Sequence, residues 1–204
     1  MSQISSIKEL RAVIGDEIPG LQDKNIDYLD DFAIEFIQAS PFTVLSTSDQ
    51  NGRLDASPKG DEPGFVKVLD NKTLVIPDRP GNKLAYGHRN ILENPRVGLI
   101  FMIPKTSETL RINGTAQLDA TPELLDELEA RGKPAIIGIK VNVEECFFHC
   151  GKAFIRSGLW QPKKWPEEKH KVSFGDMYAA RMAANKEVAE MIDASIEDDY
   201  KNNL

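Results

Sequence analysis

The chain has 204 residues, of which 41% are hydrophobic and 28% are charged, as in an ordinary soluble globular protein. Its formal net charge of -7 at pH 7 argues against general nucleic-acid binding, which requires a basic face. There are 2 cysteines and hence no disulfide framework, the N-terminus has no apolar signal core, and no apolar run reaches the roughly 20 residues that span a bilayer. We therefore expect a cytoplasmic protein of one domain, 1–204, without nucleic-acid or membrane partners.

Residues 1–40 are predicted to form a helical N-terminal extension. Ile7, Leu10 and Ile14 have helical spacing, and Gly15 ends that run. A second amphipathic helix is predicted where apolar residues follow the i, i+3, i+4, i+7, i+8 pattern: Leu29, Phe32, Ala33, Phe36 and Ile37. We expect these residues to face a core.

Two β-hairpins follow the N-terminal helices. The first covers 42–59 with a turn at 49–52, where Gly52 can adopt positive φ, and the second covers 65–77 with a turn at 70–72. Pro58 cannot donate to a strand ladder, so it indicates a strand end, an edge strand or a bulge.

Residues 73–103 have the pattern of a strand, a turn, a short helix and another strand. Pro80 and Gly81 are predicted to turn the chain, so that Asn82 and Lys83 lie in the first turn of the helix. Pro95 ends this helix, and the continuously apolar run 97–103 predicts a strand buried on both faces.

The remaining chain is predicted to contain a strand at 109–118 with Gly114 at a bulge, a helix starting at 121–123, and a long strand at 135–148. Residues 160–204 are predicted to be a C-terminal loop and a helix over 174–191, with a frayed polar tail. About seven strands joined mostly as hairpins predict a mainly β (α+β) fold, with an antiparallel sheet closed into a small barrel and peripheral helices.

The segment DRPGNKLA, residues 78–85, carries the groups that a phosphate needs. Arg79 can make a bidentate contact, Gly81 permits close backbone approach, and Asn82 and Lys83 would add donors at a helix N-terminus. The segment has neither GxxxxGKS nor GxGxxG, so it is not a P-loop or a dinucleotide fingerprint. The alternative at this point is that Arg79 and Lys83 are solvated surface charges.

The wider sequence around this segment resembles the pyridoxamine 5′-phosphate oxidase-like proteins, which have an FMN-binding split β-barrel. The resemblance covers roughly residues 30–165 and is strongest to a subfamily of probable FMN-dependent proteins of unknown substrate. It is carried by FTVLSTSDQNGRLDASPKGD, by PDRPGNKLAYGHRNILENPRVGLIFMIP, by ETLRINGTAQL and by CFFHCGKAFIRSGLWQP. The pattern N-K-x(6)-N-I-x-x-N-P-x-V is its most specific part.

The resemblance implies a homodimer with FMN at the subunit interface, bound across the barrel strands. It implies cofactor contacts from one strand (Asp55, Ser57, Pro58 and Lys59), from the backbone beside the flavin ring (Ile76, Pro77 and Asp78), at the phosphate (Arg79, Asn82 and Lys83), and from Arg111, Trp160 and Gln161. Trp160 and Gln161 are expected to reach the flavin of the second subunit.

The chain departs from the vitamin B6 oxidases themselves. Their basic strand motif is reduced here to Arg53 and Lys59 at the ends, and their C-terminal Arg-Leu-x-Pro signature is absent. These departures weaken the expectation of a vitamin B6 substrate more than the expectation of a flavin.

Cys146, His149 and Cys150 resemble a metal cluster by their spacing. On a regular strand Cys146 and Cys150 would face one side and His149 the other, so we expect thiols and no metal site, with a redox role for Cys150 as the lesser alternative.

The predicted function is that of an FMN-dependent oxidoreductase that transfers a hydride to or from bound FMN and acts on a small-molecule substrate that the sequence does not identify. No catalytic residue is assigned. Two alternatives remain: a split barrel that binds or degrades heme, with His149 or His170 as ligand, and a non-catalytic flavin-binding module.

Overall fold

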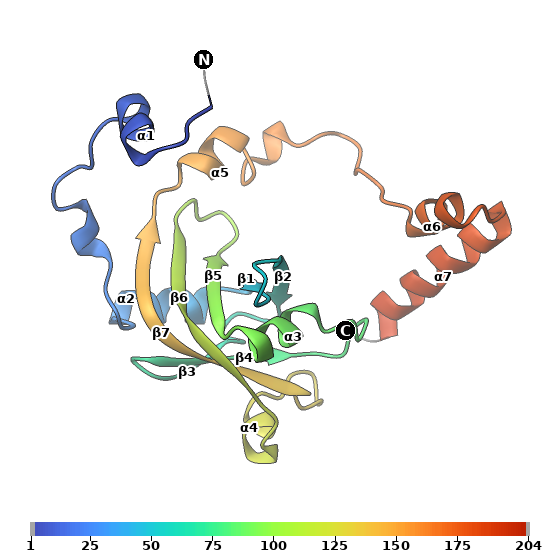
Figure 1. Ribbon diagram of the computed structural model, residues 1–204. Coiled ribbons are helices and arrows are strands. Elements are labelled where there is room, and N and C mark those ends of the chain that lie inside the picture. Colours follow the sequence, from blue (N-terminus) through green and yellow to red (C-terminus); the bar gives the residue numbers. More distant parts are fainter. Residues whose placement is uncertain (1–2, 203–204) are drawn as a thin grey trace.

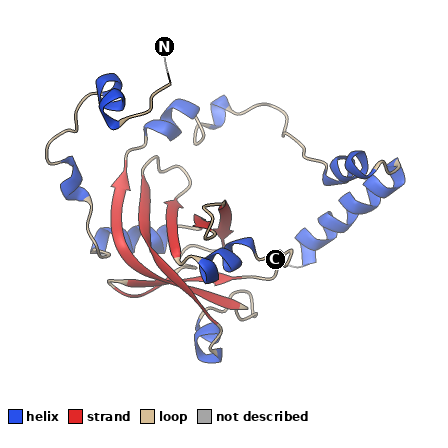
Figure 2. Cartoon of the chain, in the orientation of Figure 1, coloured by secondary structure: helices blue, strands red, loops and turns tan. Residues whose placement is uncertain are grey.

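The structure is a computed structural model that describes residues 3–202. A seven-stranded sheet in the order β2-β1-β5-β6-β7-β4-β3 forms its centre, and every neighbouring pair is antiparallel (Figures 1 and 2). The strands are β1 (Phe42–Ser48), β2 (Leu54–Gly60), β3 (Lys67–Asp70), β4 (Thr73–Asp78), β5 (Arg96–Met102), β6 (Thr109–Asp119) and β7 (Ile137–His149). The predicted mainly β, antiparallel split-barrel fold is therefore confirmed.

The sheet curls around one apolar core, to which β1, β4, β5, β6 and β7 all contribute side chains. Leu45, Ile76, Phe101, Ile112 and Val141 are among its fully buried members. At the open side of the barrel, β2 approaches β4 through side chains, where Lys59 meets Asp78 2.5 Å away. No backbone pairing joins β2 to β4 among residues 3–202, so this is where the barrel is split.

The helices lie around the sheet. They are α1 (Ile7–Ile14), α2 (Asp31–Ala39), α3 (Tyr86–Glu93), α4 (Pro122–Glu127), α5 (Lys152–Ser157), α6 (Phe174–Met182) and α7 (Lys186–Asn202), with 3-10 turns at Leu21–Lys24 and Pro162–Lys164. None of the described helices is long and apolar enough to cross a membrane.

Helix α2 packs on the core through a narrower stripe than the sequence predicts. The Asp30 side chain accepts a hydrogen bond from the Ala33 amide at 2.8 Å and caps the helix, while Leu29, Ala33 and Ile37 are buried. The expectation that Phe32 faces the core is wrong, because its side chain is 72% exposed. Phe32 instead lines a surface pocket together with Phe36 and Phe148.

Two features of the strands test the sequence predictions. The pairing of β6 with β7 shifts register between Asn113 and Gly114, which confirms the predicted bulge. A Cβ atom at Gly114 would lie 2.0 Å from the carbonyl oxygen of Asn142, so only glycine fits there. Strand β5 is fully buried on one face only and half-buried on the other, contrary to the expected burial on both faces.

The C-terminal segment forms two helices where one was predicted. The chain breaks at Ala183, which has φ 51°, and α7 then packs back on α6. Gly175 allows this contact, since a Cβ there would lie 1.9 Å from the Ala189 carbonyl oxygen. The polar tail that was predicted to be frayed is residues 196–204; residues 196–202 belong to α7, and residues 203–204 lie outside the described part of the chain. Figure 1 shows this hairpin beside the barrel, joined to it by a long extended segment.

Candidate functional site

A cavity of about 560 Å³ lies at the split, between β2 and the end of β4. This volume is within the range of about 300 to 1,000 Å³ that is typical of small-molecule sites. Three parts of the chain build its polar side: β2, the loop 79–85 and the first turn of α3. Its apolar side contains Leu45 from β1 together with Ile136, Ile137 and Ile139 at the start of β7.

The loop 79–85 follows the cavity before α3 begins. The helix starts at Tyr86, so the prediction that Asn82 and Lys83 lie in its first turn is wrong. The Asn82 Oδ1 atom accepts a hydrogen bond from the Leu84 amide at 3.0 Å, which holds the chain in a turn instead of a helix. Lys83 and Ala85 have φ of 58° and 55°, which is a strained backbone for residues other than glycine.

Helix α3 starts later in the chain than the sequence predicts, and its N-terminus therefore lies at the cavity. Tyr86, Gly87 and His88 are the first helical residues and all three line the cavity. The amides of a helix's first turn have no partner within the helix, and they carry a partial positive charge. The site thus combines free amides with the cationic side chains of Arg79 and Lys83, which also line it.

Arg79 is oriented by a buried carboxylate. Its Nε atom donates to Oδ2 of Asp61 at 3.1 Å, and the Asp61 side chain is only 3% exposed. The other carboxylate oxygen lies 3.2 Å from Nη2 of Arg131. The Nη1 atom of Arg79 is buried and has no hydrogen-bond partner among the described residues. A buried guanidinium nitrogen without a partner indicates a place for an acceptor atom of a ligand.

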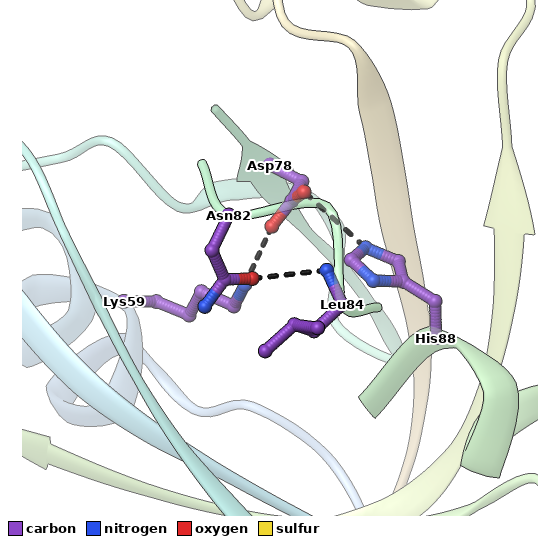
Figure 3. A network of polar contacts seen from close by, with 5 residues as sticks. All are labelled: Lys59, Asp78, Asn82, Leu84 and His88. Atoms are coloured by element: carbon purple, nitrogen blue, oxygen red, sulfur yellow. Dashed lines mark hydrogen bonds and ion pairs between the residues drawn. The ribbon is translucent and has the colours of Figure 1, made fainter. Parts of the chain in front are cut away.

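A second charged network crosses the split (Figure 3). Asp78 lies between two basic side chains: Lys59 Nζ is 2.5 Å from its Oδ1, and His88 Nε2 is 3.3 Å from its Oδ2. Burial raises the pKa of Asp78, but the contacts with His88 and Lys59 outweigh it, so the pKa lies below its ordinary value. Asp78 therefore carries a negative charge at neutral pH, inside the cavity wall.

The sequence pattern that includes Asn90, Ile91 and Asn94 positions α3 on the barrel. The Asn90 side chain donates to the hydroxyl of Thr47 at 2.9 Å, and the Asn94 side chain donates to that of Ser48 at 2.8 Å. Ile91 is buried in the core. These contacts to β1 fix the helix whose first turn faces the cavity.

The structure brings most of the predicted site residues together. Eight of them line the cavity: Asp55, Ser57, Pro58, Lys59, Asp78, Arg79, Asn82 and Lys83. Ile76 and Pro77 precede Asp78 on β4, and their side chains are buried. Strand β3 pairs with β4 only over Thr73–Val75. Within the described chain, the β4 backbone from Ile76 onward therefore has no strand paired to it on that edge. Cofactor contacts from these ten residues remain a prediction.

The other three predicted residues lie outside this cavity. Arg111 lies on β6, where it pairs with Ile100 of β5 and Phe147 of β7. The cavity is lined by Ile139, which pairs with Leu118 at the other end of the β6–β7 ladder. Trp160 stacks on Phe154 with ring centroids 5.7 Å apart. Gln161 is exposed and follows α5, which is attached to the far end of β7. These three residues therefore do not line the cavity of their own chain, and cofactor contacts from them remain a prediction.

Sequence reasoning missed His88 and Asp61. Neither residue is among those that the sequence predicts for the site. The signal for His88 was its place in the first turn after a phosphate-like loop. Asp61 had no local signal, because its partners Arg79 and Arg131 are distant in sequence.

The cysteine and histidine cluster does not form a metal site in the described part of the chain. Cys146 is buried and Cys150 is exposed. Burial and the nearby charge of Asp30 raise the pKa of Cys146 to about 12, so its thiol is protonated at neutral pH. His149 and His170 do not line the cavity at the split.

Comparison with known proteins identifies the family. The family model for pyridoxamine 5′-phosphate oxidase matches residues 29–150, which include every strand of the sheet and α3. The chain belongs to this family. No curated protein is similar enough to count as a match.

Several solved structures resemble the chain at low identity. HupZ of Group A Streptococcus is 17% identical, with a TM-score of 0.48, over 59% of this chain and 93% of its own. A putative pyridoxamine 5′-phosphate oxidase from Lactobacillus delbrueckii is 22% identical, with a TM-score of 0.46, over 60% of this chain and 95% of its own. An FMN-binding protein from Syntrophomonas wolfei is 12% identical, with a TM-score of 0.43, over 56% and 86%. The family assignment rests on the family model alone.

Proposed function

We propose that the cavity at the split binds FMN and that the protein is an FMN-dependent oxidoreductase. The observation that carries this proposal is the buried, unpartnered Nη1 atom of Arg79, in a cavity that also contains Lys83 and the first turn of α3. A phosphate monoester supplies acceptor oxygens and a charge near -2, which match this donor set. The apolar wall of Leu45, Ile137 and Ile139 suits a flat ring system at the other side of the same cavity.

The residues of this chain would divide the work of binding. Arg79, Asn82, Lys83 and the free amides of α3 hold the phosphate, and Asp61 keeps the Arg79 side chain in place. Lys59 lies on β2, far in sequence from the loop 79–85, and would contact a polar edge of the flavin ring. Bound FMN would supply the hydride chemistry, and the chain would supply position and charge.

We infer that a second copy completes the site. Arg111, Trp160 and Gln161 lie away from the cavity of their own chain, so a role in cofactor binding requires that they reach the cavity of a partner. The Nε1 atom of Trp160 and the Nε atom of Arg111 are buried and have no hydrogen-bond partner within residues 3–202. Light scattering tests this: the expected result is a dimer, and a monomer that binds FMN with full affinity would contradict it.

The experiment for cofactor binding is a titration of the purified protein with FMN, followed by flavin absorbance and fluorescence. Arg79→Ala combined with Lys83→Ala is expected to weaken binding at least about 100-fold, because each charge-assisted hydrogen bond contributes about 1.5 to 3 kcal/mol. The matched control is Lys163→Ala with Lys164→Ala, which removes the same charge from an exposed turn. Equal losses in both variants, or no binding by the unmodified protein, would overturn the proposed site.

Catalysis is tested separately on the FMN-loaded protein. A nicotinamide or deazaflavin donor is expected to reduce the bound FMN, and a second substrate is expected to reoxidise it, so that the protein turns over. A protein that binds FMN tightly but is reduced by no such donor and reoxidised by no acceptor would be a flavin-binding module instead of an enzyme.

A further inference from the structure

Two basic side chains share one carboxylate at the split. Asp78 holds Lys59 at 2.5 Å on one oxygen and His88 at 3.3 Å on the other (Figure 3). The three side chains come from three different elements, β4, β2 and α3. Their exposed fractions are only 11%, 17% and 16%, so none of them is freely hydrated.

The two contacts of Asp78 are unequal. The contact with Lys59 is a short, charge-assisted hydrogen bond. The Nε2 atom of His88 is buried and close to Asp78, yet no hydrogen bond of good geometry forms there. Lys59 is thus the principal counter-ion of Asp78, and His88 is a second partner whose interaction is only partly formed.

A bound anion changes this balance. Lys59 lines the cavity, so an electron-rich or negatively charged ligand competes with Asp78 for its ammonium group. If the ligand takes that ammonium, the Asp78 carboxylate is left nearly buried without a full counter-ion, which is costly. A histidine ordinarily titrates between pH 5 and 8, so it can gain a proton at little cost when a carboxylate needs a partner.

We propose that His88 accepts a proton from solvent when an anionic ligand binds in the cavity, and that it then replaces Lys59 as the counter-ion of Asp78. No bond other than the new N–H bond on the imidazole ring forms, and no electrons are transferred. This inference deepens the proposed function, on which it rests, because the anionic ligand considered is FMN. Protonation of His88, which lines the cavity, would make the affinity for the ligand depend on pH.

Few other charged groups face His88 from the elements around it. Strand β1, against which α3 packs, has no ionisable side chain, and the ionisable residues of β6, Arg111 and Asp119, do not line the cavity. The ionisable groups that do line the cavity, apart from His88 itself, are Asp55, Lys59, Asp78, Arg79, Lys83 and Tyr86. Of these, Asp78 is the one in ion-pair contact with His88.

The test is calorimetric titration with FMN near pH 7 in two buffers of different ionisation enthalpy, Pipes and Tris, which gives the number of protons taken up per FMN bound. The phosphate of FMN titrates near pH 6 and contributes in every variant, so the difference between variants isolates His88. His88→Gln is expected to lower the proton uptake, while His170→Gln, an exposed histidine outside the cavity, is expected to leave it unchanged. Linkage also predicts that affinity for FMN falls with rising pH, by at most about tenfold per pH unit for one proton, and less steeply in His88→Gln.

The chain has 3 histidines, so the same proton can be observed directly. Nitrogen-15 NMR of the unmodified protein is expected to show the His88 ring becoming doubly protonated on addition of FMN, and this measurement does not depend on whether His88→Gln folds. Proton uptake identical in the unmodified protein and in His88→Gln, or a His88 ring that stays neutral in the complex, would overturn the inference. Absence of any FMN binding would instead overturn the proposed function.

Discussion

The Nε atom of Arg79 donates a hydrogen bond of 3.1 Å to Asp61, whose side chain is 3% exposed. This contact holds the guanidinium group of the loop against the barrel and leaves Nη1 buried without a partner. Arg79 lines the cavity, so a carboxylate that fixes its Nε atom also fixes a guanidinium group beside the place where an anion would bind. The entropy of ordering a long side chain has then been lost during folding and is not lost again on binding.

Asp61→Asn is therefore expected to weaken FMN binding about tenfold, equivalent to about 1.4 kcal/mol, because it removes the charge that orients Arg79. The dissociation constant from fluorescence titration measures this. The control is Arg131→Gln, since the Arg131 side chain is 50% exposed and its loss leaves the contact between Asp61 and Arg79 in place. A larger loss of affinity in Arg131→Gln than in Asp61→Asn would contradict the positioning role.

The charge on Asp78 makes the site sensitive to acid. Burial raises the pKa of Asp78, but the contacts with His88 and Lys59 bring it below the ordinary value of 3.8. A carboxyl whose pKa is lower in the folded state stabilises the fold above its unfolded pKa, and this contribution is lost as the pH falls through the folded value. Asp78→Asn is expected to cost about 2 to 4 kcal/mol at pH 7, partly because it leaves Lys59 without its partner, and less at pH 3.

Urea unfolding at pH 7 and at pH 3 measures this difference. Asp55→Asn serves as the control, because no ion pair of Asp55 is found in the described part of the chain. A cost for Asp78→Asn that is the same at both pH values would contradict a charged Asp78.

The two thiols are expected to react at very different rates. Burial raises the pKa of Cys146 to about 12, so almost none of it is thiolate at pH 8, while Cys150 is exposed. A thiol-specific chromogenic reagent should modify one thiol rapidly in the folded protein and the second only after denaturation. In Cys150→Ser the rapid phase should disappear. Rapid modification of Cys146 in that variant would show that the end of β7 opens.

Gly114 is expected to be the glycine most sensitive to substitution in the sheet. Gly114→Ala places a Cβ 2.0 Å from the carbonyl oxygen of Asn142, and backbone atoms cannot move aside without disturbing the ladder of β6 and β7. A loss of about 2 kcal/mol or more in unfolding free energy is expected. Gly81→Ala, whose Cβ would meet only the Arg79 carbonyl oxygen at 4.0 Å, should change stability little. Comparable losses would mean that the bulge adapts.

The strands could be predicted because their signals are local. Turn residues at 49–52 and 70–72, β-forming residues between them and a single glycine at the bulge lie within a few positions of the features that they produce. The start of α3 could not be predicted in this way. A run such as Asn82 to Ala85 is compatible with a helix, and its turn depends on the Asn82 side chain and on strained φ values at Lys83 and Ala85.

Only those parts of the candidate site that are formed by short continuous segments of the sequence could be predicted. Eight of the predicted residues share the cavity because they lie on β2, at the end of β4 and in the loop 79–85. The roles of Asp61 and His88 depend on contacts between elements that are distant in sequence, which periodicity and spacing do not contain. The exposure of Phe32 shows the same limit, since the width of the covered stripe on α2 is set by the barrel and not by the helix.

Within residues 3–202, strand β2 is hydrogen-bonded along one edge, to β1, and its other edge faces β4 through the contact of Lys59 with Asp78. A barrel closed by a complete backbone ladder would have a fixed interior, whereas here no ladder sets the distance between β2 and β4. Strand β1 is hydrogen-bonded to β5 and is held in the sheet, so β2 is the strand beside the opening that can bend without breaking a hydrogen bond of β5, β6 or β7. The width of the opening is therefore coupled to one ion pair, between Lys59 and Asp78.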